Sequence, residues 1–542
     1  MSSPAKSAAP NVALDLATQF LKIAPQFRLG ELPTEGRHPR TKSLSHLAQN
    51  NLEDALALLK DVELEALDSA FAHARTDLEE LKVAIERTWS EGGRVFFCGC
   101  GATGRLSVSL ESLYRKRALG LDRKRAPDRD DVFSFIAGGD YALVRSIENF
   151  EDHPEYGAQQ LRDLGFGARD LLVATTEGGE TPFVIGAAQE AATISHHPTW
   201  FLFCNPQATL LNLERCHSTF ENKNIRSLSL ATGPMALAGS TRLQASTVLM
   251  LAAGSALFAA KNPADPETSV TASAWSHVEE FRAMLAKSDF SVLAPLISRE
   301  AEAYAKGKRC VHSAGEHAIT VMTDTTERSP TFSIAPFENE QRPSDRPAWT
   351  YLHVPNTQSA EQAWEAVLMR KPRALTWKSV AQKYDAGVLA GFNFSNDVIT
   401  RRKKELGSPL IFSVEGHDGH LHLSVGGRSA TLPFEGSILT EHLLLKCAMN
   451  MSSTLVMGRL GRFESNLMLF VKASNNKLID RSIRFIQLLA LDRGLNFDYE
   501  AVCHALFEVR VDLDPEESIV LKTLDRLIGS TASDQSEQGR IA

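Results

Sequence analysis

Residues 94–105, RVFFCGCGATGR, restrict more than any other segment what this chain can fold into. An apolar run ends in three closely spaced glycines and Thr103, and the helical stretch LSVSLESLYRK follows at once. A strand that turns this tightly into a helix gathers backbone N–H groups and a hydroxyl around one concavity at the helix N-terminus. The segment therefore predicts an anion cradle, most naturally for phosphate. It lacks the Gly-Lys-Ser/Thr end of a Walker loop, so we expect a phosphorylated small molecule.

Two later segments repeat this pattern of an apolar run followed by small and hydroxyl-bearing residues. Residues 170–182, DLLVATTEGGETP, precede a helical stretch, and residues 233–247, GPMALAGSTRLQAST, precede an apolar helix predicted for 248–260. The carboxyl ends of parallel strands meet at one edge of a sheet, and ligands bind there. The three segments therefore predict one shared site in the first half of the chain.

Short apolar runs alternate with helical stretches from residue 94 onward, which is typical of a parallel α/β sheet covered by helices on both faces. The strands predicted for the first half are RVFFCG, VFSFIAG, DLLVATT, TWFLFCN and IRSLSLA. A second cycle begins near residue 288, with strands predicted in KRCVHSAG, RSPTFSIAP, WTYLHVP, RALTWKS, PLIFSV and ATLPF. The predicted fold class is α/β, with two doubly wound parallel sheets flanked by helices.

The two halves are similar to each other, which indicates an internal duplication. VHSAGEHAIT takes the place of FCGCGATGRL, and EGSILTEHLLLKCAMNMSSTL takes the place of AGSTRLQASTVLMLAAGSAL. The second copy carries Ser313, Gly315, Glu316 and His317 where the first has its glycines and hydroxyl. It has therefore lost the phosphate chemistry, and we expect one ligand site per chain.

The composition limits the kinds of partner. The 542 residues carry 58 basic and 66 acidic side chains, for a net charge of −8, without a basic stripe, so nucleic acid is not an expected partner. The longest apolar stretch, residues 247–260, is short for a membrane span. The opening MSSPAKSAAP has no secretory pattern, and seven scattered cysteines agree with reduced thiols. We expect a cytoplasmic protein with no cofactor and no metal site.

Breaks in the patterns predict four parts. Residues 1–72 form a polar tail and a helical arm packed on the first domain, and residues 468–542 form a C-terminal helical cap with a disordered tail. Between them lie the ligand-binding domain, residues 73–270, and its degenerate copy, residues 271–467. A chain of this length is too long for one hydrophobic core, which agrees with this division.

Several motifs are similar to those of sugar isomerase (SIS) domains. GCGATGRLS, IAGGDYALVRSIENFED, the CNP of 204–206 and AGSTRLQAST occur in the order found in that family. The TEG of 34–36 and the NNKLIDR of 475–481 resemble the branch that holds bacterial N-acetylmuramic acid 6-phosphate etherase and the animal glucokinase regulatory protein. The resemblance implies two tandem SIS domains and a hexose phosphate or amino-sugar phosphate as the ligand.

The loop pattern and the resemblance together assign a set of ligand-binding residues. They are Gly101, Ala102, Thr103, Gly104, Arg105, Gly178, Gly179, Thr181, Ser240, Thr241, Arg242, Glu327 and Lys477. Plainer interpretations stay open. The glycines alone would make a tight turn, Arg105 could tie loops together, Ser240 and its neighbours cap a helix in any case, and Lys477 could be a solvated side chain.

Proton removal next to a carbonyl, which both lactate release and sugar isomerisation require, normally uses one or two positioned carboxylates. By resemblance to the etherase, Glu151 is one of them, and the alternative is that it belongs to the polar face of a helix. The other etherase position falls on Leu113. The nearest carboxylate, Glu111, is one candidate for the catalytic partner of Glu151, although it would face elsewhere unless the helix is reset. Glu177, which borders the predicted pocket, is a second candidate for the partner.

Two further departures weaken the neutralisation of a phosphate. The family's Ser-Gly-Arg is Gly178, Gly179 and Glu180 here, and the usual Lys of its STRLK segment is Gln244. A hydroxyl and an ammonium group are lost, and carboxylates are added near the same loop. Arg105 and Lys477 are the cations that could compensate.

Two functions stay open on this evidence. One is a carbon–oxygen lyase or phosphosugar isomerase related to the etherase, with Glu151 as the proton-transfer residue. The other is a non-catalytic sensor, like the glucokinase regulator, in which sugar phosphate changes the affinity for a regulated protein partner. A structural paralogue that binds no ligand is the third alternative.

Overall fold

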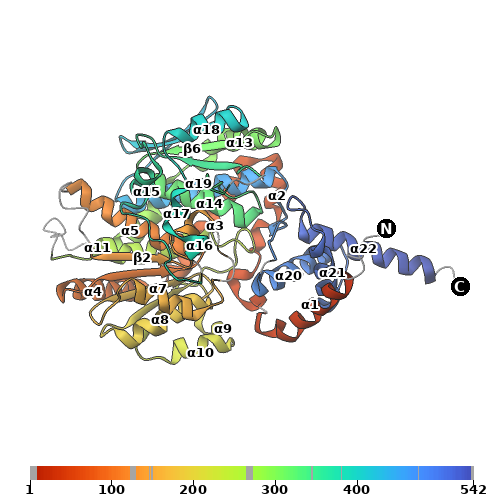
Figure 1. The fold of residues 1–542 in the computed structure, drawn as a ribbon, viewed down its shortest axis with the longest axis horizontal. Helices are drawn as coiled ribbons and strands as arrows, with labels where there is room; N and C mark the ends of the chain where they lie inside the picture. Colours follow the sequence, from red (N-terminus) through yellow and green to blue (C-terminus); the bar gives the residue numbers. More distant parts are fainter. Residues whose placement is uncertain are drawn as a thin grey trace.

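The computed structural model describes residues 9–27, 29–121, 130–145, 147, 150–263, 273–342, 346–379, 381–473 and 475–538. Two five-stranded sheets and the helices around them form its core. In Figure 1 the first sheet lies in the lower part of the molecule and the second at the top. The sheets fall within the two segments, 73–270 and 271–467, that the sequence assigns to separate domains.

The first sheet is parallel throughout, with strand order β2-β1-β3-β4-β5. Its strands are β1 (Val95–Gly99), β2 (Val132–Ile136), β3 (Leu171–Thr176), β4 (Thr199–Phe203) and β5 (Ile225–Ser229), which confirms all five predicted runs. Strands β1, β3 and β4 are buried along their whole length because helices cover both faces. The direction of winding reverses between β1 and β3, and the crevice at such a reversal is where doubly wound sheets bind ligands.

Helices cover the two faces of the first sheet. On one face α4 (Arg75–Ser90) and α5 (Ala102–Leu121) both contact α11 (Gln244–Ala259). On the other face α7 (Pro154–Asp163) and α10 (Glu214–Glu221) both contact α8 (Pro182–Ile194). The short helices α6 (Tyr141–Val144) and α9 (Gln207–Leu210) lie in the loops after β2 and β4.

The second sheet is mixed, with strand order β10-β9-β8-β6-β7. Its strands are β6 (Cys310–Ala314), β7 (Thr350–His353), β8 (Leu410–His417), β9 (His420–Val425) and β10 (Arg428–Pro433). Parallel strands β7-β6-β8 repeat the arrangement of β2-β1-β3, as expected for a duplication, but β8, β9 and β10 are antiparallel. The two-residue turns 418–419 and 426–427, with positive φ at all four residues, form hairpins where crossover helices were expected.

Two of the strands predicted for the second half are wrong, and β9 was missed. RSPTFSIAP begins within the last turns of α14 (Ala318–Phe332), and RALTWKS has no regular structure. The remaining helices of this half are α12 (Ala274–Lys287), α13 (Ala294–Ala305), α15 (Ala360–Leu368), α16 (Ala381–Tyr384), α17 (Ala386–Ala390), α18 (Asp397–Leu406) and α19 (Ile438–Arg459).

Helices α11 and α19 pack against each other in the centre of the molecule. Every residue of α11 is buried, and so are most residues of α19. A helix that is apolar all round belongs in a core or in a membrane. Within the described ranges, none of the helices combines the length and the apolar character that a membrane crossing needs. The apolar stretch 248–260 is thus a core helix, as predicted.

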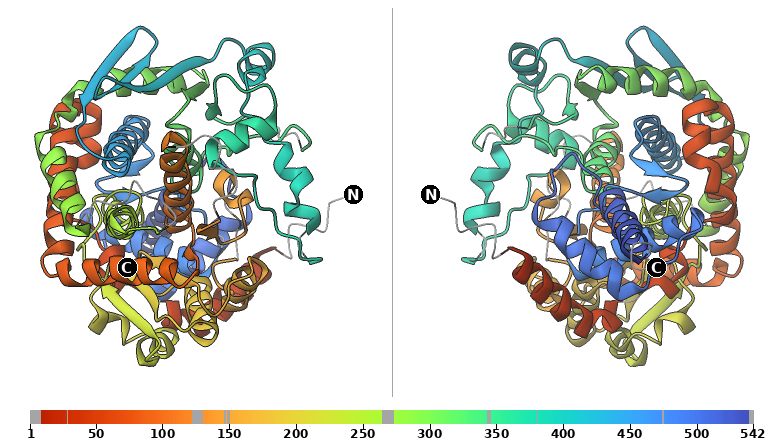
Figure 2. Two further views of the ribbon diagram at one scale, coloured as in Figure 1. Left: turned by 90° about the vertical axis from the view of Figure 1, so that its left-hand side faces the viewer. Right: turned by 90° about the vertical axis from the view of Figure 1, so that its right-hand side faces the viewer.

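The two ends of the chain pack together at one side of the molecule, where α1, α20, α21 and α22 form a separate lobe (Figure 1). The N-terminal helices are α1 (Ala9–Ile23), α2 (Leu44–Asn50) and α3 (Leu52–Phe71); the C-terminal ones are α20 (Asn476–Asp492), α21 (Tyr499–Val511) and α22 (Ile519–Gln538). Figure 2 shows this lobe end-on. The N-terminal arm was expected on the first domain, where α3 does pack on α11, whereas α1 packs on α21 and α2 on α19. The predicted disordered tail is helical as far as Gln538, and the last four residues lie outside the described part.

The loop that follows α15 reaches the first sheet through a buried ion cluster. Glu111 of α5 accepts hydrogen bonds from Arg370 Nε at 3.0 Å, Arg373 Nη2 at 2.9 Å and Arg115 Nε at 3.0 Å. Burial raises the pKa of this carboxyl, but the three guanidinium groups outweigh it and hold the pKa at about 2. Glu111 is therefore an ionised structural residue, which corrects the catalytic role expected for it. The same contacts explain why the segment beginning at Arg373 is not a strand.

Glu111→Ala should leave these guanidinium groups buried without their shared counter-ion. We expect the free energy of unfolding to fall by about 3–5 kcal/mol, measured by urea denaturation followed by tryptophan fluorescence. Glu316→Ala is the control. Glu316 pairs at 3.3 Å with Lys116, which lies on α5 like Glu111, but the Glu316 side chain is 79% exposed. That loss should stay below about 1 kcal/mol. Equal losses in the two variants would contradict a structural role for Glu111.

Candidate functional site

The end of β1 and the start of α5 form a turn in which the backbone approaches its neighbours closely. A Cβ atom on Gly99 would lie 2.3 Å from the carbonyl carbon of Thr103, and one on Gly104 would lie 2.3 Å from Cγ1 of Ile136. The Thr103 hydroxyl accepts from the Cys100 N–H at 3.0 Å and donates to the Cys100 carbonyl at 2.9 Å. The turn is as tight as the sequence predicts, but this hydroxyl is bonded within it.

The loop between β3 and α8 closes on itself in a similar way. Thr176 Oγ1 lies 3.0 Å from Thr181 Oγ1 and accepts from the Gly179 N–H at 3.2 Å. The Gly178 carbonyl accepts from Asn205 Nδ2 at 2.9 Å, which ties this loop to the one after β4. The hydroxyl of Thr181 is therefore engaged inside its own loop.

The loop before α11 joins the first half of the chain to the second. The Thr241 side chain hydrogen-bonds the carboxyl of Glu177. The side chain of the following residue, Arg242, points toward the second half of the chain. Its Nη2 donates to Thr454 Oγ1 at 3.1 Å, and its Nη1 lies 3.4 Å from Asp324 Oδ1. The structure therefore gives Arg242 a buried contact with the second half in place of the ligand contact that the resemblance implies.

Three carboxyl groups whose pKa is raised form what we call the carboxyl cluster: Glu151, Glu177 and Glu327. Burial raises the pKa of Glu177 to about 8, and the neighbouring Glu327 adds to the rise. Burial also raises the pKa of Glu151 and of Glu327. Glu177 Oε1 is buried without a hydrogen-bond partner. Such oxygens are rare in folded proteins, and strongly perturbed carboxyls gather at functional sites.

The start of α20 reaches this cluster with an amide and a cation. Asn475 Nδ2 donates to Glu151 Oε1 at 2.9 Å, and Lys477 Nζ donates to Glu180 Oε1 at 2.8 Å. Burial lowers the pKa of Lys477, but Glu180, Glu151 and Glu35 outweigh it and raise the pKa overall. The negative charge that Glu180 adds to the second loop is thus paired with Lys477 and with Arg215.

A cavity of about 20 Å³ lies between the glycine turn and the second half of the chain. Its lining includes Ala102, Arg105 and Glu327, which the sequence predicts, and Lys446 and Asn450, which it does not. A lone cation inside the apolar run LLLKCAMNM is the signal that could have identified Lys446, because lysine is almost never buried without a partner. The cavity holds about one water molecule, so a hexose phosphate requires the surrounding loops to move.

The structure brings part of the predicted site together. Close charge interactions and hydrogen bonds connect Glu151, Glu177, Glu327, Arg105, Thr241 and Lys477. The predicted residues Gly101, Ala102, Thr103, Gly104, Gly178, Gly179, Thr181 and Ser240 belong to the three loops that carry this group. Glu111 lies in a separate ion cluster, whereas Arg242 pairs with Asp324 and also interacts electrostatically with Glu327. Cys100, whose Sγ lies 3.9 Å from Glu151 Oε2, was not predicted.

The two outlying motifs of the chain meet beside the same loops. Arg481 Nη2 donates to Glu35 Oε1 at 2.6 Å. Asn205 Nδ2 donates to Thr34 Oγ1 at 2.8 Å. The TEG motif is therefore held between the loop after β4 and helix α20, which fixes the helix that carries Lys477.

Residues 78–192 match the family model of the N-terminal SIS domain of glucokinase regulatory protein. Residues 78–192 therefore belong to an SIS domain. The SIS chain is 35% identical over 228 residues to N-acetylmuramic acid 6-phosphate etherase of Crocosphaera subtropica, a match that covers 41% of this chain and 66% of that protein. It is 28% identical over 228 residues to the etherase of Francisella tularensis subsp. novicida, covering 41% and 68%. The SIS chain thus spans just under two thirds of the length of the first of these relatives.

Two solved structures are similar to the SIS chain. One is the C-terminal domain of glucosamine-fructose-6-phosphate aminotransferase from Francisella tularensis, at 10% identity and a TM-score of 0.38 over 75% of this chain and 96% of that chain. The other is tagatose-6-phosphate ketose/aldose isomerase from Escherichia coli, at 11% identity and a TM-score of 0.38 over 74% and 92%. The architecture described here rests on the strand orders of the two sheets.

The raised pKa of Glu177 should make stability fall as pH rises. Between pH 4.5 and about 8 the folded protein keeps a proton on this carboxyl that the unfolded chain has lost, so deprotonation favours unfolding. Glu177→Gln removes this titration. We expect the melting temperature of the variant, relative to that of the parent, to increase steadily from pH 5 to pH 8. Glu316→Gln, at an exposed carboxyl in the turn after β6, is the control. The prediction is contradicted if the melting temperatures of the two variants change in parallel with pH.

Proposed function

We propose that this SIS protein binds an amino-sugar phosphate or hexose phosphate at the carboxyl cluster and acts on it as an etherase-type lyase or an isomerase. The observation that carries the proposal is the buried, unpaired Oε1 of Glu177, in a carboxyl whose pKa is raised to about 8, beside the glycine turn. Two carboxyls held in different protonation states are what acid–base catalysis at neutral pH requires. The etherases that match this chain support the choice of substrate class.

In this proposal Glu151 is the base and Glu177 the acid. Asn475 donates a hydrogen bond to Glu151, and Lys477 partly offsets the burial that raises the pKa of Glu151, whereas burial raises the pKa of Glu177 to about 8. The base takes the proton from the carbon next to the carbonyl. The ether C–O bond on the adjacent carbon then breaks, and the departing lactate oxygen receives the proton of the acid. Isomerisation would use the same first step.

The phosphate would be held at the N-terminus of α5. The first backbone N–H groups of a helix have no partner inside it, and they favour an anion. Arg105 adds a positive charge beside the same turn, and Glu327, whose pKa is raised by burial, repels a phosphate less when it is neutral. These groups offset the loss of the hydroxyl at Gly178 and of the ammonium group at Gln244.

Glu151→Gln should lower kcat by about 10²-fold or more, because an amide cannot accept the substrate proton. Lactate release from N-acetylmuramic acid 6-phosphate, and isomer exchange with hexose and hexosamine phosphates, measure the loss. Glu155→Gln is the matched control, because this carboxyl is exposed and pairs with His153 on the surface. If Glu151→Gln keeps full turnover, the base is elsewhere and the proposed mechanism fails.

A second candidate function is a sugar-phosphate sensor that regulates a protein partner. The position where the etherase carries its other carboxylate is the buried, apolar Leu113, and Gln244 is used structurally, with its Oε1 accepting from the Ala236 N–H at 2.7 Å. The matching family model, that of a glucokinase regulatory protein domain, favours the same candidate.

Thermal shift and turnover together separate the two candidates. Sugar phosphates that raise the melting temperature without being turned over would favour the sensor. Turnover that Glu151→Gln abolishes while the thermal shift is retained would favour the enzyme. If no sugar phosphate changes the melting temperature, neither candidate stands, and a structural role without a ligand replaces them.

A further inference from the structure

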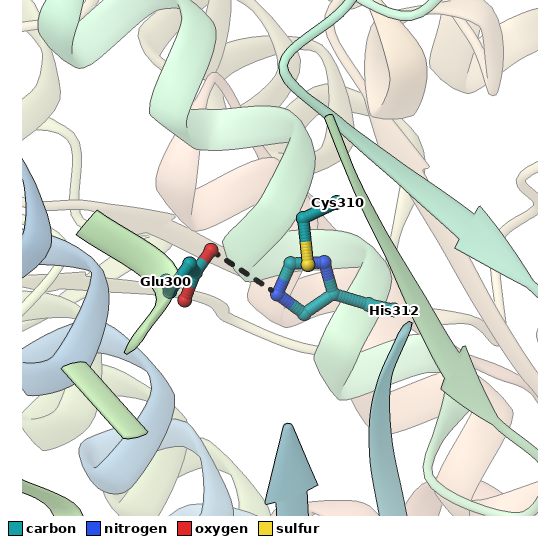
Figure 3. Close-up of side chains that lie close together, drawn as sticks. All are labelled: Glu300, Cys310 and His312. Carbon is teal, nitrogen blue, oxygen red and sulfur yellow. Dashed lines mark ion pairs between the residues drawn. The ribbon is translucent and has the colours of Figure 1, made fainter. Parts of the chain in front are cut away.

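Among the described residues, one group of potential metal ligands whose ligand atoms converge lies outside the proposed site, buried in the second half of the chain. Figure 3 shows Glu300, Cys310 and His312 facing one another, with ligand atoms within 4.8 Å of each other. The guanidinium group of Arg328 already occupies the place of a cation beside these side chains. Its Nη1 donates to Glu300 Oε1 at 2.6 Å. Burial also raises the pKa of the Cys310 thiol, which disfavours the thiolate that binds metals. This group is therefore an ion cluster of the core.

Three further histidines lie on the hairpin of β8 and β9. In the antiparallel register His417 faces His420, and Glu415 faces His422. Residues directly opposite each other, and residues two apart on a strand, share one face of a sheet. All four side chains therefore project from the same face. That face is the outer one, because its alternate neighbours Leu421 and Leu423 are buried.

The three imidazole rings are already close to one another. The ring centroids of His417 and His422 lie 4.1 Å apart, and those of His420 and His422 lie 6.0 Å apart. The hairpin closes with the two-residue turn Asp418-Gly419, which holds the two strand ends in register. The backbone thus fixes the spacing of the rings while the side chains stay accessible to solvent.

Each ring uses the same nitrogen for a local contact. His417 Nδ1 lies 3.3 Å from Asp418 Oδ2, and His420 Nδ1 lies 2.8 Å from the Asp418 carbonyl oxygen. His422 Nδ1 lies 3.3 Å from Thr431 Oγ1 of the adjoining strand β10. In metal sites a carboxylate, carbonyl or similar group holds one ring nitrogen and leaves the other for the ion. Here Nε2 is the nitrogen left for a ligand on all three rings.

We propose that His417, His420 and His422 form a surface binding site for a divalent cation of the zinc and copper group, with Glu415 or water as the fourth ligand. Imidazole is the ligand that Zn²⁺, Ni²⁺ and Cu²⁺ share, and three imidazoles with one oxygen complete a tetrahedral zinc site. The two stacked rings must turn about their side-chain torsions to point at one ion, which exposed side chains do rapidly.

The position of this site separates it from the proposed sugar-phosphate site. Strands β8–β10 form the light-blue outer edge at the top of both views in Figure 2, whereas the carboxyl cluster belongs to the first sheet and α14. A bound ion would cross-link β8 to β9 at the hairpin that replaces the expected crossover. It would stabilise the second sheet without touching the residues proposed for catalysis.

Calorimetric titration of the full chain with zinc chloride at pH 7.5, without any affinity tag, tests the proposal. We expect one zinc ion per chain, and a loss of affinity of more than about tenfold when His417, His420 and His422 are all changed to Gln. The matched control removes three exposed histidines elsewhere: His73→Gln, His196→Gln and His217→Gln.

Copper(II) electron paramagnetic resonance gives a second readout. The parent and the control variant should show nitrogen hyperfine coupling from several imidazoles, and the hairpin variant should lose it. Equal melting temperatures of all three proteins in EDTA would show that the hairpin variant is folded. The proposal is overturned if the parent binds no zinc, or if the hairpin variant binds it as tightly as the parent does. None of these results depends on sugar-phosphate turnover.

Discussion

The close approach of α5 to the end of β1 is the constraint on which the site depends. Gly99 and Gly104 permit it, since a Cβ atom at either position would overlap its neighbours. The approach places Cys100 and Arg105 within electrostatic reach of Glu177. The winding of the first sheet reverses between the neighbouring strands β1 and β3. The turn after β1 and the loop after β3, which carries Glu177, therefore lie at the same edge of the sheet with no crossover connection between them. Two small residues thus set the geometry of a carboxyl cluster to which they contribute no charge.

Burial gives carboxyl groups of the same kind opposite properties in different parts of this protein. Glu111 is surrounded by three guanidinium groups, so it stays ionised and holds the two halves together. Among the described residues Glu177 forms no ion pair with an arginine, and burial outweighs the effect of Lys477 and raises its pKa to about 8. Removing an ion from water is costly unless a partner replaces the lost solvation. The presence or absence of arginine, rather than the depth of burial, therefore separates a structural carboxylate from a candidate acid.

Much of the first half could be predicted from the sequence because its signals are local. The five strands follow from continuous apolar runs, and the tight turn follows from the spacing of its glycines. The second half was harder to predict, because its differences from the first half depend on short turns. The DG and GG dipeptides that close the two hairpins are recognisable signals, yet the duplication suggested crossovers there. The roles of Glu111 and Arg242 could not be predicted, because the partners Arg370 and Arg373 of Glu111, and Asp324 and Thr454 of Arg242, are more than 80 residues away in the chain.

A path of contacts connects Glu177 with the second half of the chain. Thr241 hydrogen-bonds Glu177, and the adjacent Arg242 is buried against Asp324, which also pairs with Arg328. A ligand that moves Thr241 must therefore disturb a fully buried ion network or be resisted by it. In an enzyme, that resistance holds the acid in place, which is the preorganisation that catalysis needs. In a sensor, the same network would make the contacts between the two halves differ between the ligand-bound and ligand-free states. Only such a difference can shift a conformational equilibrium. In either case the second half of the chain would act on the proposed site through its buried core.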